Sequence, residues 1–218
     1  MRIRQLQPCP GFDTPVALSA ELCAKFYESG YRYVMRYTPW WRDCIHEDPE
    51  PDFQGWFFGL SKSELRIIMN SGLSLGLIQM MHKSVKLDYQ TGTERGLNLV
   101  ANARALGLPE GSTLWCDGEF KDAEALDVTK FLRGFGEAVA KADRPGLYWG
   151  YERYTNESLY KLPHFRSYMR AGMMYLADPQ PRSYCCYQGV EQVTHGIDID
   201  PSFQTYDAKR DRPWFVCP

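Results

Sequence analysis

The chain has 218 residues, of which 44% are hydrophobic and 24% are charged, and its formal net charge is −2. These values predict one folded domain spanning residues 1–218 and exclude a disordered chain. No basic surplus is available to neutralise phosphates, which argues against nucleic acid as the main partner. The N-terminus lacks the apolar core of a signal peptide, and no run approaches the ~18 apolar residues of a membrane span. We therefore expect synthesis in the cytoplasm without a signal peptide, and no membrane insertion.

Strand-like and helix-like segments alternate along the whole chain. The strand-like segments are short and apolar or rich in β-formers, and they lie at 11–13, 31–37, 73–80, 113–117, 146–150, 173–177, 183–188 and 197–200. The helical patterns cover 19–29, 61–72, 94–106, 122–142 and 153–161. Ser19 is suited to cap the first helix, and Gly30 to end it.

Alternating β and α units predict a parallel sheet, and about eight of them favour a closed barrel. The expected fold class is therefore α/β, a single TIM-like (β/α)8 barrel, with an open doubly wound sheet as the alternative. Connections near the C-terminus are short, so some helices should be missing or vestigial. A long aromatic loop at 38–62 contains Trp40 and Trp41, which either form a sugar platform or partner contact or anchor the loop by packing.

The strongest chemical signal is a pair of carboxylates directly after the strand at 113–117. Asp117 and Glu119 are two residues apart, so in an extended chain they share one face with Cα atoms roughly 6 to 7 Å apart. Glycosidases use carboxyl groups about 5 to 9 Å apart, one holding a proton and the other ionised. The alternative is that these residues only begin a loop and cap the next helix.

Polar residues at other predicted strand ends favour the catalytic interpretation. They are Asp13, Gln79, Gln188, Asp198 and Asp200. Such residues converge only if the strands are parallel in a barrel, whose active sites form at the carboxyl ends of the strands.

At this point the chain resembles the family-25 glycoside hydrolases, the lysozyme-type muramidases, and still more their bacterial relatives known as glycoside-hydrolase-like domains of uncertain function. The resemblance runs in order along nearly the whole chain and is carried by 11–13, 30–37, 72–80, 105–109, 117–119, 146–150, 187–188 and 197–200. The chain departs from the family where Tyr187 replaces a frequent Trp and Asp200 replaces a frequent Asn.

The resemblance implies a role for each matching residue. Glu119 would be the general acid, and Asp117 would stabilise the oxocarbenium-like state or position the substrate acetamido group. Asp13 and Asp198 would complete an acidic, catalytic floor. The implied substrate contacts are Tyr37, Arg36, Gln79, Tyr148, Trp149 and Gln188.

Other chemistries find little support in the residues. The four histidines, His46, His82, His164 and His195, are scattered, and the seven cysteines fit no zinc pattern, so we expect neither a metal nor another cofactor. Most cysteines are expected to be reduced, small apolar residues. Cys116 lacks the positive partner that a thiolate nucleophile needs.

Three functions follow from these observations. The first is a peptidoglycan-degrading glycoside hydrolase of the lysozyme or N-acetylmuramidase type, such as a phage-type endolysin or a secreted antibacterial effector. It would act at the cell wall or periplasm after release or secretion, with an immunity or delivery protein as a further partner. The second is a non-catalytic barrel that binds cell-wall glycan. The third, a peptidoglycan amidase or peptidase, is disfavoured because no metal or Cys-His site is apparent.

Overall fold

The computed structural model describes residues 1–38, 45–48, 59–80, 85–118, 124–149, 162–170, 185–204 and 212–218. Within these ranges the helices are α1 (Ala20–Glu28), α2 (Lys62–Ser71), α3 (Tyr89–Ala105) and α4 (Ala125–Val139). The strands are β1 (Arg2–Arg4), β2 (Cys9–Asp13), β3 (Tyr33–Thr38), β4 (Ser74–Gln79), β5 (Thr113–Asp117), β6 (Arg144–Trp149), β7 (Ser167–Arg170), β8 (Cys186–Gln188), β9 (Gln192–Thr194), β10 (Ile197–Gln204) and β11 (Phe215–Cys217).

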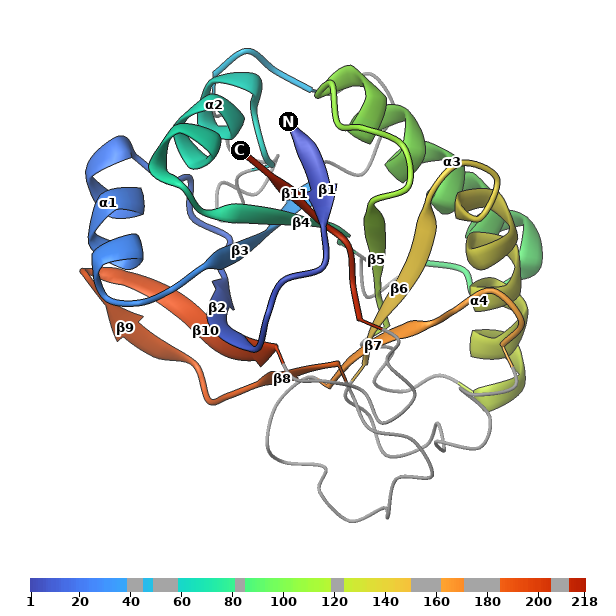
Figure 1. Ribbon diagram of the computed structural model, residues 1–218. Coiled ribbons are helices and arrows are strands. Elements are labelled where there is room, and N and C mark those ends of the chain that lie inside the picture. The colour runs from blue at the N-terminus through green and yellow to red at the C-terminus, as the bar shows by residue number, and fades with distance from the viewer. Residues whose placement is uncertain are drawn as a thin grey trace.

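Eight of these strands close into a barrel. Strands β2 to β8 pair in parallel in chain order, and β10 closes the ring by pairing antiparallel with both β8 and β2. Figure 1 shows the four helices around part of this ring, whereas no described helix covers β8 and β10. The predicted TIM-like barrel with missing helices is therefore confirmed. No described helix is long and apolar enough to span a membrane.

Side-chain alternation along the strands divides the apolar core into two layers. The interior of the barrel contains Tyr33, Met35, Ile78, Trp115 and Phe215. The layer between strands and helices holds the alternate strand residues, with the inner faces of the helices. Since successive strand residues point to opposite faces, each strand supplies both layers, and its polar residues are divided in the same way.

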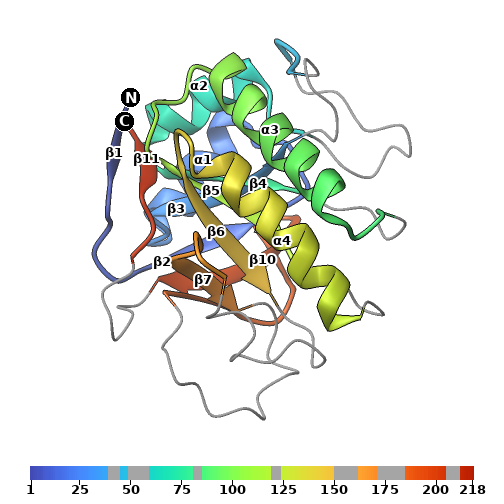
Figure 2. The same ribbon diagram turned by 90° about the vertical axis from the view of Figure 1, so that its right-hand side faces the viewer.

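Local sequence signals place the helices. Ser19 Oγ accepts a hydrogen bond from Leu22 N at 3.2 Å, which confirms the predicted cap of α1. Helices α3 and α4 lie side by side (Figure 2) and approach closely through glycine, because a Cβ atom at Gly92 would lie 2.0 Å from the carbonyl oxygen of Phe131. Gly134 of α4 lies at the same helix–helix contact, since a Cβ atom there would lie 2.1 Å from Tyr89 O. The close approach of the two helices therefore explains why glycine occurs inside α4.

The structure also differs from the predicted elements. Strand β7 begins at Ser167, a segment that the sequence pattern did not indicate, and the predicted strand at 173–177 lies outside the described residues. The predicted helix at 153–161 and the loop tryptophans Trp40 and Trp41 also lie outside them. Helix α3 begins earlier than predicted, because Asp88 caps it by accepting a hydrogen bond from Thr91 N.

Candidate functional site

Carboxylates from three strands meet at one end of the barrel. Asp13 is the last residue of β2, and Asp117 is the last residue of β5, so both lie at carboxyl ends of parallel strands. Asp200 lies in the antiparallel strand β10, where it is directly opposite Asp13 in the register. The charges of Asp200 and Asp117 both act on Asp13, which places the three groups in one electrostatic cluster. This is the end at which barrel enzymes form their active sites.

Asp13 is held by neutral hydrogen-bond donors. Its Oδ1 accepts a hydrogen bond from the Tyr37 hydroxyl at 2.7 Å, and its Oδ2 accepts one from Gln188 Nε2 at 3.0 Å. The Tyr148 hydroxyl donates to Gln188 Oε1 at 2.7 Å, which orients the amide so that its nitrogen faces Asp13. Four side chains from β2, β3, β6 and β8 thus form one chain of hydrogen bonds across the mouth of the barrel.

Burial controls the ionisation of Asp13. Its side chain is almost completely buried, with 1% exposed. This desolvation, followed by repulsion from Asp200, raises the pKa of Asp13 to about 7, although the bonds from Tyr37 and Gln188 oppose the change. Desolvation, followed by repulsion from Glu191, raises the pKa of Asp200 to about 6. The negative charge of Asp200, when it is ionised, favours the protonated form of Asp13.

Asp117 differs from Asp13 because it is only partly buried. It pairs in register with Tyr148, whose hydroxyl belongs to the hydrogen-bonded chain. Directly after it, Gly118 N donates to Tyr148 O at 2.7 Å, and a Cβ atom at Gly118 would lie 2.7 Å from that same oxygen. Gly118, between Asp117 and Glu119, therefore has no room for a side chain, and its small size lets the chain stay in close contact with β6 as it leaves β5.

Two predicted site residues cannot be placed in this arrangement. Glu119 lies outside the described residues. Trp149 ends β6, but its side chain is also outside the described part of the structure. Their roles stay predictions.

Asp198, the second aspartate of the predicted acidic floor, is not the residue that lies opposite Asp13. Asp198 is exposed and pairs with Val193 in the β9–β10 hairpin, beyond the end of β2. Asp200 lies two residues further along the same face of β10 and is the one opposite Asp13. Both aspartates follow the same strand-like segment in the sequence, and only the antiparallel register shows which of them lies opposite Asp13.

Two of the predicted substrate contacts, Arg36 and Gln79, lie on the other face of the sheet. Arg36 is fully buried between β3 and α2, where its Nε donates to Glu64 Oε1 at 2.7 Å. Gln79 is also fully buried, and its Oε1 accepts a hydrogen bond from Asn98 of α3 at 3.2 Å. Neither side chain points into the barrel, and the reason is the same for both, since Tyr37 and Ile78, their strand neighbours, are the residues that point inward.

The arrangement can support acid–base chemistry. It offers carboxyl groups with different exposure and different pKa values, in which one acid can stay protonated while another is ionised. Within the described ranges, no group of three or more His, Cys, Asp or Glu side chains is arranged to hold a metal ion.

Comparison with known proteins supports a relationship to sugar hydrolases. The family model of the Rv2525c-like, glycoside hydrolase-like domain matches residues 24–208. The Tat-secreted protein Rv2525c of Mycobacterium tuberculosis, in complex with HEPES, superposes with a TM-score of 0.67 at 13% identity, over 90% of this chain and 95% of that one. No curated protein matches the sequence.

Two solved lysozyme-type structures share the fold. A muramidase from Trichobolus zukalii has a TM-score of 0.57 at 15% identity, over 88% of this chain and 92% of its own. A family GH25 lysozyme from Aspergillus fumigatus has a TM-score of 0.54 at 8% identity, over 91% and 94%. At these identities the likeness concerns the fold alone.

Proposed function

Because the chain belongs to the family of Rv2525c-like, glycoside hydrolase-like domains, we propose that it is a glycoside hydrolase acting on an amino-sugar glycan of the bacterial cell wall. The bond would lie between N-acetylmuramic acid and N-acetylglucosamine. The observation that carries this proposal is the cluster of Asp13, Asp117 and Asp200 at the end of the barrel where the parallel strands have their carboxyl ends. The muramidase with the same fold adds support for the substrate class.

In the proposed reaction, Glu119 donates a proton to the leaving oxygen. Asp117 stays ionised and faces the positive charge that develops on the sugar ring, or it positions the acetamido group. Asp13 is too buried to contact a sugar, with 1% of its side chain exposed, so it acts through its neighbours. Its role would be to position other side chains. The hydrogen bonds that join Tyr37, Asp13, Gln188 and Tyr148 fix the orientation of these side chains at the mouth of the barrel.

The first experiment is a zymogram on purified peptidoglycan, followed by mass analysis of the released ends. Glu119→Gln preserves size and hydrogen bonding but cannot deliver a proton, so it should lower lytic activity by about 100-fold or more. Asp117→Asn should be similarly impaired. Glu124→Gln is the matched control, because Glu124 is exposed before α4 and its side chain makes no capping hydrogen bond.

Wild-type lysis by Glu119→Gln, with an unchanged thermal melt, would show that this carboxylate is not the acid. Release of free peptide amines instead of reducing sugar ends would indicate an amidase or peptidase.

A second candidate function is a non-catalytic barrel that binds cell-wall glycan. The burial of Asp13 by Tyr37 and Gln188 favours it, because a covered carboxylate cannot contact a substrate directly. Absence of lysis by the wild-type protein on several wall types, together with sedimentation on those walls, would establish the binding function. In either case we propose that the protein acts at the wall or periplasm after release or secretion, as an endolysin or antibacterial effector would.

A further inference from the structure

A second pocket lies at the end of the barrel opposite the carboxylates. It is formed by the amino ends of β2, β3 and β4 together with β1 and β11, and its volume is about 470 Å³. Eleven described residues line this basal pocket, among them Arg2, Arg4, Tyr27, Arg32, Ser74 and Cys217. Such a volume suits a small ligand, since ligand pockets typically measure about 300 to 1,000 Å³.

The charged side chains that line this basal pocket are all positive. Three of the eleven lining residues are arginines, and none of these described lining residues has an acidic side chain. The chain as a whole has a net charge of −2, so this concentration of arginine does not reflect its composition. A concave site with one sign of charge attracts ligands of the opposite sign.

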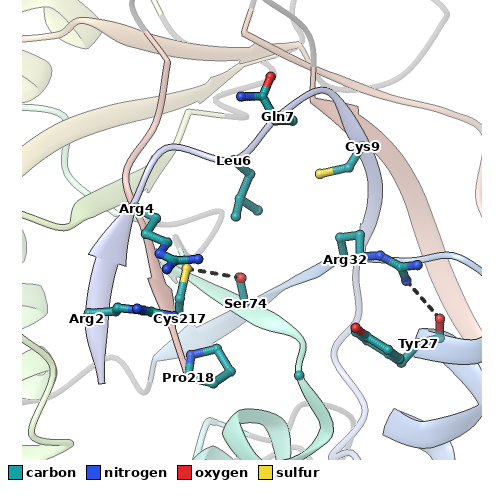
Figure 3. A pocket seen from close by; sticks show the side chains of 11 residues that line it. Arg2, Arg4, Leu6, Gln7, Cys9, Tyr27, Arg32, Ser74, Cys217 and Pro218 are labelled. Atoms are coloured by element: carbon teal, nitrogen blue, oxygen red, sulfur yellow. Dashed lines mark hydrogen bonds between the residues drawn. The ribbon is translucent and has the colours of Figure 1, made fainter.

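The fold holds Arg2 and Arg4 on the same side of the pocket. They are two residues apart in β1, so their side chains share a face, while β1 is held in register against β11 through Arg2↔Cys217 and Arg4↔Phe215. Figure 3 shows both arginines beside Cys217, whose Sγ accepts a hydrogen bond from Ser74 Oγ at 3.2 Å. Both are exposed, and neither has a hydrogen-bond or ion-pair partner among the described residues.

Arg32 lies on the opposite side of the pocket and is oriented by its surroundings (Figure 3). Its Nη1 donates to Tyr27 O at 2.9 Å and to Tyr31 O at 2.7 Å, and its guanidinium carbon lies 4.5 Å from the centre of the Tyr27 ring. A guanidinium has five N–H donors, and the bonds of Arg32 within the described structure use only Nη1. These contacts turn the guanidinium of Arg32 toward Tyr27 and away from Arg2 and Arg4, so Arg32 borders the pocket with the aliphatic part of its side chain.

We propose that this basal pocket binds the phosphoryl group of a small soluble molecule. A phosphoryl group supplies up to two negative charges and three acceptor oxygens, which match the two guanidinium groups of Arg2 and Arg4 better than a single carboxylate does. Arginine forks bind phosphate oxygens in pairs. The pocket is at the opposite end of the barrel from Asp13, so its occupant does not compete with a ligand at the carboxylates, and the proposal is independent of glycan hydrolysis.

The test is calorimetric titration of the protein with inorganic pyrophosphate and with inorganic phosphate, at low and at high salt. Wild-type protein should bind, and the double variant Arg2→Gln/Arg4→Gln should weaken binding by about tenfold or more, because it removes both guanidinium groups that face the ligand. The matched control is Arg133→Gln, an exposed arginine of α4 that does not line the pocket, and it should leave the affinity within about twofold.

Thermal melts without ligand confirm that each variant is folded, and ligand should raise the melting temperature of the wild type more than that of the double variant. Three results would overturn the proposal. One is no binding of either phosphate compound by the wild-type protein. Another is an equal loss of affinity in Arg133→Gln. The third is binding to phosphatidylglycerol vesicles without binding to pyrophosphate, which would indicate a membrane surface as the partner.

Discussion

Two buried polar networks lie on opposite faces of β3, and adjacent residues belong to them. On the outer face, Arg36 pairs with Glu64, whose Oε1 also accepts a hydrogen bond from Leu18 N at 2.9 Å. On the inner face, Asp13 accepts hydrogen bonds from Tyr37 and Gln188, which are neutral and are its donors among the described residues. Arg36, Glu64 and Asp13 are all buried, but within the described structure only the carboxylate of the outer network faces a positive charge.

The difference shows how burial can serve structure or chemistry. A carboxylate that forms an ion pair with a guanidinium ties a strand to a helix, as Glu64 ties β3 to α2. A carboxylate that is buried among hydroxyl and amide groups beside other carboxylates has a raised pKa, as Asp13 does. Both carboxylates are buried, so the candidate site differs from the supporting structure in that Asp13 faces no positive partner among the described residues.

The largest expected effect comes from breaking the outer network. Glu64→Gln removes the charge that balances Arg36 in a pair whose side chains are both 0% exposed. Removing one partner of a buried ion pair typically costs about 3 to 5 kcal/mol, since the other charge is left buried. For a chain of this length, the melting temperature should fall by about 6 to 20 °C.

The control for this variant is Glu47→Gln, because Glu47 pairs with Arg66 on the surface, where both side chains are more than half exposed. That substitution should cost about 1 kcal/mol or less. Equal melting temperatures for Glu64→Gln and the wild-type protein would contradict the role assigned to the outer network.

The second effect is a pH-dependent change at the inner network. Asp13 has a pKa of about 7 in the folded protein, against an ordinary value of 3.8, so the folded state binds more protons than the unfolded state between these values. Raising the pH from about 4 to above 7 should therefore destabilise the wild-type protein through this group, by up to a few kcal/mol. Asp13→Asn cannot ionise, so its stability relative to wild type should increase over the same window.

Urea unfolding of both proteins between pH 4 and pH 8.5 measures this difference, since contributions from carboxylates that do not interact with Asp13 cancel between them. A stability difference that does not vary with pH would show that Asp13 ionises as freely in the folded protein as in the unfolded chain.

The smallest effect compares two neighbouring residues on the two faces of β3. Tyr37→Phe removes a hydrogen bond that lowers the pKa of Asp13, so that pKa should rise by about one unit. Thr38→Val changes the next residue, which is fully buried and follows Tyr37 on the opposite face, and it should leave the pKa of Asp13 unchanged. Carbon-13 NMR titration of the Asp13 carboxyl group measures its pKa in both variants. Equal changes of this pKa in Tyr37→Phe and Thr38→Val would contradict the assignment of the two residues to opposite faces of β3.

The sequence alone supported a large part of these conclusions. Alternating strand and helix patterns predicted the barrel, because a parallel sheet needs a crossover after each strand. Asp13 and Asp117 were predicted to meet because strand ends converge at one mouth, and the charge of Asp117 does act on Asp13. The local signals at Ser19 also sufficed, since a helix cap depends on residues three positions apart.

Other features depended on contacts between distant parts of the chain. Arg36 and Tyr37 are adjacent, and only the closed barrel decides which of them points inward. Asp198 and Asp200 share a face of one strand, and only the antiparallel pairing with β2 places Asp200 opposite Asp13. The basal pocket joins Arg2 and Arg4 with Arg32 through pairing of β1 with β11, the two ends of the chain. Period-two patterns reveal that a strand has two faces, but the partner strand determines the register, and the closure of the sheet determines which face is the interior.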